Sequence, residues 1–176
     1  MTNAISIVQT LATAAKPWAK LYSDSTAVSS GVTFLHLAGL LFAGGLAVSS
    51  DRATFRAFRG NEDDRSRLLT ELGNSHGWVI AGLTVIFASG LLLALADVKT
   101  FATSPVYWTK MSLVALLLAN GLVLQRTERR LRAASLVGQP DAPVRKLWSR
   151  LRLSAAASMT LWTAIVLAGV VLVEAS

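Results

Sequence analysis

The chain has 176 residues, of which 53% are hydrophobic and only 15% are charged, and the charges gather in short segments between long apolar runs. A soluble domain carries about a quarter charged residues, spread over its exposed faces, so this pattern predicts an integral membrane protein. The lack of cysteine excludes disulfides and thiolate metal sites. The net charge is +7, but the sequence lacks the basic stripe with interleaved aromatic residues that would predict nucleic-acid binding.

Residues 1–26 form the first segment, which we predict to lie at the membrane interface. The apolar residues from Ile5 to Leu11, with Trp18 and Leu21, suit a short amphipathic helix, and a disordered segment is the equal alternative. Lys16 follows the apolar run instead of preceding it, which is unlike a secretory signal peptide.

Residues 27–176 form the predicted transmembrane domain. A helix needs about 20 residues to cross a bilayer, and four apolar stretches reach that length, at about 27–49, 76–97, 105–125 and 153–174. Their interiors hold no Asp, Glu or Arg, so no buried acid is expected. Small residues recur at four-residue spacing, as in Gly39, Ala43 and Ala47, which favours close helix packing in lipid. The predicted fold is an all-α, four-transmembrane-helix bundle.

The orientation of the bundle follows from the loops. All the arginines fall in the predicted loops 50–75 and 125–152, which should be partly helical, with a break at 139–143 in the second. By the positive-inside rule these loops are cytoplasmic, so both termini lie on the outer side of a bacterial inner (plasma) membrane. Three tryptophans near the predicted membrane boundaries suit an aromatic belt: Trp78, Trp108 and Trp148.

Ionisable residues within spans are costly and are therefore the candidate site residues. They are His36 in the first span and Lys110 in the third, with His76 at the entrance of the second. His36 should lie roughly 7 to 13 Å from the outer edge, whereas His76 lies about 15 Å or more deeper, so one haem held by both histidines is not expected. Lys110 follows the start of the third span by five residues, which places it near the level of His36.

A His–Lys pair at one level suits a carboxylate, a quinone oxygen, a porphyrin propionate, or a haem whose iron is the metal bound by His36. The structural alternatives are a packing role for His36, a Lys110 side chain that extends to the headgroups, and a capped helix start at His76. Asn120, in the inner half of the third span, is expected to make an interhelical hydrogen bond.

Two short stretches resemble known bacterial membrane families. The run from Phe34 to Gly45 followed by Ser50-Asp51-Arg52, and Gly90 to Leu93 followed by Pro105 to Met111, resemble the copper-resistance-D-like (CopD-like) four-helix membrane domain and related uncharacterised families. His36 and Lys110 also match a first-helix histidine and a later helix-opening lysine in the bacterial membrane protoporphyrinogen oxidase family. This resemblance implies a four-helix membrane architecture and haem as a cofactor.

Two classes of function follow from these observations. The first is a multi-pass membrane protein whose outer-leaflet His36–Lys110 site binds haem, a porphyrin or a quinone-like molecule, with a redox role as one interpretation. The second is a non-enzymatic membrane subunit that packs against partner chains or a second copy of itself. Copper-resistance-type metal transport is a weaker alternative, because the soft methionine ligands it needs are few. No catalytic residue is assigned, and both an enzyme and a non-enzymatic protein fit the sequence.

Overall fold

The computed structural model describes residues 2–137 and 141–174, without the side chains of residues 2–5, 74–76, 135–137, 141–143 and 172–174. Within this described part the chain is helical and has no strand. The helices are α1 (Thr2–Ala14), α2 (Lys16–Asp24), α3 (Thr26–Arg59), α4 (Glu62–Ala96), α5 (Val98–Thr103), α6 (Pro105–Val137) and α7 (Asp141–Glu174). The prediction of an all-α chain with four helices able to span a membrane is confirmed, since α3, α4, α6 and α7 are long and apolar enough.

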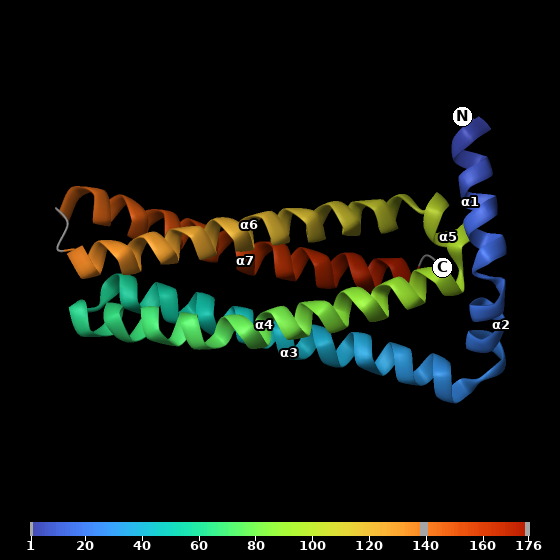
Figure 1. Ribbon diagram of the computed structural model, residues 1–176, viewed down its shortest axis with the longest axis horizontal. Coiled ribbons are helices and arrows are strands. Elements are labelled where there is room, and N and C mark those ends of the chain that lie inside the picture. Colours follow the sequence, from blue (N-terminus) through green and yellow to red (C-terminus); the bar gives the residue numbers. More distant parts are fainter. Residues whose placement is uncertain (1, 138–140, 175–176) are drawn as a thin grey trace.

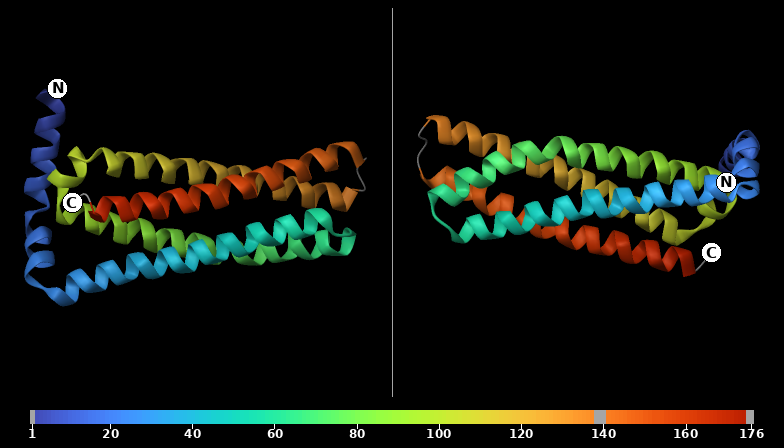
Figure 2. Two further views of the ribbon diagram at one scale, coloured as in Figure 1. Left: turned by 180° about the vertical axis from the view of Figure 1, so that it is seen from behind. Right: turned by 90° about the horizontal axis from the view of Figure 1, so that it is seen from below.

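The four long helices form two antiparallel hairpins, α3–α4 and α6–α7, which lie side by side (Figure 1). α3 packs on α7, whereas the backbones of α4 and α6 stay apart over most of their length. α1 and α2 lie across one end of the bundle, roughly perpendicular to it (Figure 2). We call this end, which also holds α5 and the end of α7, the terminal end. The opposite end, where α3 and α6 end and α4 and α7 begin, is the basic end.

Local hydrogen bonds explain where the long helices begin. The Ser25 side chain caps α3 by accepting a hydrogen bond of 3.4 Å from the amide of Val28. At the start of α4 the side chains of Asn61 and Asp64 each accept a hydrogen bond from the other's backbone amide, which is a reciprocal capping box. As a result, only Gly60 and Asn61 separate α3 from α4.

The long helices continue well beyond the apolar stretches, so the segment 50–75, which was expected to be a partly helical loop, is helical to Arg59 and again from Glu62. Each has 33 to 35 residues, which is about 50 Å at 1.5 Å per residue, against a hydrocarbon core of about 30 Å. The segment 125–152 is also helical to Val137 and again from Asp141, and the predicted break includes residues that lie outside the described ones. Hydropathy marks where a helix can leave a bilayer, whereas Arg, Glu and Leu remain good helix formers past that point.

Two apolar clusters hold the bundle together. The membrane cluster joins α3, α6 and α7 through Ala43, Leu117, Trp162 and Ile165, with partly buried neighbours that include Leu40, Ile86, Leu113 and Val114. The basic-end cluster lies beyond it and consists of Ala57, Leu68, Leu69, Leu72, Leu131, Trp148 and Leu151.

Tight contacts within these clusters confirm the predicted close packing and correct one assignment. A Cβ added to Gly82 of α4 would lie 2.8 Å from the Cβ of Ala43 on α3, so the two helices approach closely through small residues. Trp148 is 6% exposed inside the basic-end cluster, so its assignment to an aromatic belt is wrong. Trp78 and Trp108 are 65% and 58% exposed, as a belt at the membrane surface requires.

Candidate functional site

A polar level, to which all four long helices contribute, follows the membrane cluster toward the terminal end. Each residue of this level lies three or four positions, about one helical turn, from a residue on the same helix that belongs to the membrane cluster or packs against it. The pairs are His36 with Leu40, Ser89 and Gly90 with Ile86, Lys110 with Leu113 and Val114, and Gly169 with Ile165. The structure therefore brings His36 and Lys110 to the same level of the bundle.

His36 is anchored to α4 by a hydrogen bond between its Nδ1 and the Oγ of Ser89, 3.1 Å long. The hydroxyl of Ser89, which is 4% exposed, donates to the backbone carbonyl of Val85 at 2.6 Å. Because that hydrogen is already used, Ser89 accepts from His36, and Nδ1 carries the imidazole proton. In the neutral ring the other nitrogen, Nε2, then keeps a free lone pair, which is the atom that a metal or a hydrogen-bond donor would meet.

Gly90 provides the space that the His36 ring occupies against α4. A Cβ added at Gly90 would lie 3.1 Å from Cε1 and 3.5 Å from Nδ1 of His36. Any larger residue there would press on the edge of the ring that faces Ser89. The imidazole orientation is thus set by two consecutive positions of α4, one that bonds Nδ1 and one that leaves room for the ring.

Lys110 reaches from α6 across to α7, where its ammonium lies beside Gly169. A Cβ added at Gly169 would be 3.5 Å from Nζ and 4.0 Å from Cε. The lysine side chain is partly buried. Its ammonium therefore stays at the polar level.

His76 lies far from this level. Its backbone belongs to α4, 13 positions before Ser89, which is about 20 Å along the helix. Its side chain lies outside the described residues. Since His36 bonds Ser89, the helix geometry places the two histidines too far apart to share one iron.

A second group of polar residues, toward the basic end, was not predicted from the sequence. Asp51 on α3 is 2% exposed, and its Oδ2 has no hydrogen-bond partner within the described residues, while Ser158 of α7 presents its hydroxyl to the carboxyl group. Glu128 on α6 is 3% exposed and pairs with Arg132 at 2.8 Å. The expectation of no buried acid is therefore wrong.

The expected role of Asn120 is confirmed nearby. Its Nδ2 donates to the backbone carbonyl of Ser154 on α7 at 2.9 Å, and the Ser154 hydroxyl donates to its Oδ1 at 2.8 Å. Arg132 makes a further link between helices, since it also donates to the backbone carbonyl of Leu69 on α4. The hydrogen bonds of this region join α6 to both α7 and α4.

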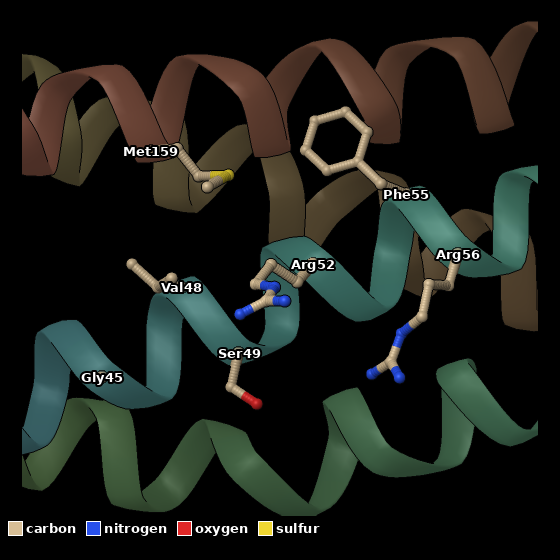
Figure 3. A pocket seen from close by; sticks show the side chains of 7 residues that line it. All are labelled: Gly45, Val48, Ser49, Arg52, Phe55, Arg56 and Met159. Atoms are coloured by element: carbon tan, nitrogen blue, oxygen red, sulfur yellow. The ribbon is translucent and has the colours of Figure 1, made fainter.

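Two grooves open on the surface of the bundle away from the polar level, and both are lined by arginines. The larger has a volume of about 720 Å³ and runs along α3 beside α7, with Gly45, Val48, Ser49, Arg52, Phe55, Arg56 and Met159 as its lining (Figure 3). The smaller, of about 480 Å³, lies between α6 and α7 and includes Arg126, Arg130 and Arg150. Neither groove includes His36 or Lys110.

Comparisons with known proteins return nothing similar: no family model, no curated protein and no solved structure matches the chain. The polar level and the grooves are therefore interpreted from their own geometry. Among the described residues, no group of three or more His, Asp or Glu side chains could hold a metal ion. A metal at the polar level would need to bring most of its ligands with it, as the iron of a haem does.

Proposed function

We propose that this chain is a multi-pass inner-membrane protein that binds haem, or a closely related porphyrin, at the His36–Lys110 level. The observation that carries the proposal is the hydrogen bond from Nδ1 of His36 to Ser89, which leaves Nε2 free as a ligand atom. Histidines that ligate metals usually donate their other ring N–H to a fixed acceptor, because this sets the tautomer and the ring orientation. Ser89 supplies such an acceptor.

The other residues of the level suit the same class of ligand. Lys110 lies at the same level of the bundle as His36, and a lysine is a suitable partner for a porphyrin propionate or for a carbonyl oxygen. Gly90 and Gly169, which have no side chain, line the same level on the two remaining helices. The backbones of α4 and α6 stay apart over most of their length, and α3 packs on α7.

Each residue has a distinct task in this proposal. His36 provides one axial nitrogen through Nε2, Ser89 fixes the ring, Gly90 gives the ring its room, and Lys110 neutralises an anionic edge of the ligand. A bound haem would supply one-electron redox chemistry.

In the orientation that we propose, this site lies in the outer leaflet. The arginine-rich ends of the long helices face the cytoplasm under the positive-inside rule, and the terminal end with α1 and α2 then faces outward. In this arrangement α2 lies at the outer membrane surface close to the site, where Trp18 donates to the backbone carbonyl of Leu92 on α4 at 2.8 Å.

The test is the absorption spectrum of the detergent-purified protein before and after haem is supplied. The chain has only two histidines, so His36→Ala and His76→Ala form a matched pair. We expect a Soret band in the wild type and in His76→Ala, and loss of this band in His36→Ala. A preparation that stays colourless after haem is supplied contradicts the proposal, as does a band of equal strength in all three proteins.

A further inference from the structure

The groove along α3 combines two arginines with an apolar floor. Arg52 and Arg56 lie one helical turn apart on α3 and both line the groove, and the close-up shows the Arg56 side chain extending from α3 toward α4 (Figure 3). The remaining lining includes the apolar side chains of Val48, Phe55 and Met159. The arginines are exposed, and neither has an ion pair with an acidic residue of the described part of the chain.

The order of these residues along α3 matches the order of groups in a phospholipid. Gly45 and Val48 belong to the apolar stretch, whereas Arg52 and Arg56 lie past its end, near 49. Gly45 and Arg52 are seven positions apart, which is about 10 Å along the helix. A phosphate at the arginines therefore leaves an acyl chain beside the apolar floor, and guanidinium groups are well suited to bind phosphate.

Gly45 leaves the apolar part of the groove open. A Cβ added at Gly45 meets no atom within 4 Å, in contrast to Gly44, where it would lie 3.5 Å from the ring of Trp162. The space beside Gly45 is thus not used by packing between helices.

We propose that this groove is a binding site for one anionic phospholipid, whose phosphate contacts Arg52 and Arg56 and whose acyl chain lies over Gly45, Val48 and Met159. Basic pockets between helices at the cytoplasmic face are suited to acidic headgroups, because phosphate contacts add to the attraction of the negatively charged leaflet. The site is separate from the haem proposal, since it lies in a different part of the bundle and shares no residue with the polar level.

The experiment uses the full-length protein in phosphatidylcholine vesicles doped with a phosphatidylglycerol that carries a photoreactive diazirine in its acyl chain. Crosslinks are mapped to peptides by mass spectrometry. We expect Arg52→Gln with Arg56→Gln to lower the yield on residues 45–56 at least about tenfold, the scale of one charged hydrogen bond. The matched control is Arg129→Gln with Arg145→Gln, which removes the same charge from exposed positions on α6 and α7 that line neither groove. It should leave that yield within about twofold, because exposed charges away from the groove are screened.

A second pair of variants tests the acyl part of the groove. Gly45→Leu fills the open space without meeting another atom at Cβ, and Gly31→Leu is its control on the same helix, since a Cβ at Gly31 also meets nothing within 4 Å. We expect the leucine at position 45 to abolish the crosslinks on 45–56 and the leucine at 31 to leave them unchanged.

Three results would overturn the proposal. Equal losses in the two double arginine variants would mean that only the overall charge attracts the lipid. Unchanged labelling in Gly45→Leu would mean that no chain lies in the groove. Displacement of the probe by inorganic phosphate, with equal labelling from a diazirine phosphatidylcholine, would show a phosphate site instead of a lipid site.

Discussion

Replacing Ser89 by alanine tests how the fold prepares His36. The substitution removes the side-chain acceptor that holds Nδ1 at 3.1 Å and leaves the imidazole less firmly fixed in its orientation and tautomer. Loss of such a supporting contact lowers affinity for a bound metal group about 10- to 100-fold, or about 1.4 to 2.7 kcal/mol. The unfolding free energy should change less, by about 1 kcal/mol, because the Ser89 hydroxyl otherwise only bonds carbonyls of its own helix.

The assay is a haem titration of the purified protein, followed at the Soret band. Thr84→Ala is the matched control, because Thr84 also bonds the carbonyl four residues earlier on α4, at 2.9 Å, but is exposed. We expect haem affinity to fall in Ser89→Ala and to stay at the wild-type value in Thr84→Ala. Wild-type haem affinity in Ser89→Ala would refute the idea that the hydrogen bond from Nδ1 to Ser89 makes Nε2 the ligand atom.

Three further predictions concern the bundle and its orientation. Gly82→Ala should lower the unfolding free energy by about 1 to 3 kcal/mol, because the added methyl group is overpacked against α3. Gly121→Ala is the control and should not lower it, since a Cβ there meets nothing within 4 Å. Thermal unfolding in detergent measures both. Trp148→Ala should cost about 3 to 5 kcal/mol and the exposed Trp108→Ala far less, and equal losses would contradict a packed cluster at the basic end. A cysteine at Arg130 should resist an impermeant thiol reagent in intact cells, and labelling there would reverse the proposed orientation.

The membrane-spanning parts of the fold could be predicted because lipid imposes a simple rule on sequence. A span must be long and apolar, and the four stretches meet that rule without reference to any neighbour. The extensions beyond the spans follow a different rule, since Leu68, Leu72 and Trp148 are buried only when the two hairpins come together. Their hydrophobic residues are diluted by many charges, so hydropathy over a window does not detect them.

The acids of the basic end show the same limit at single residues. Asp51 continues the four-residue spacing of Ala43 and Ala47, so helical periodicity indicated that it faces the bundle, but a charged residue next to a span is more often a solvated one. Glu128 stands four positions before Arg132, which is the spacing of a helical ion pair. That this pair is buried depends on α4, which the sequence of α6 does not reveal.

At the polar level the sequence indicated His36 and Lys110 but not the α4 residues that contact His36. Depth along each helix was enough to place His36 near Lys110, because both lie a fixed number of residues from a span boundary. Ser89 and Gly90 were not singled out as partners of His36, since their role depends on the rotation of α4 relative to α3. One signal was present, a serine next to a glycine inside an apolar span, where a polar residue and a gap in packing occur together.

The most direct test of the account is the protonation of the two nitrogens of the His36 ring. With ¹⁵N-labelled histidine, the nitrogen NMR spectrum contains signals from two residues, and His76→Ala leaves those of His36 alone. We predict a neutral ring with the proton on Nδ1 and an unprotonated Nε2, whose signal changes when haem is added. A proton on Nε2 with Nδ1 bare, or an Nε2 signal that haem leaves unchanged, would contradict the account.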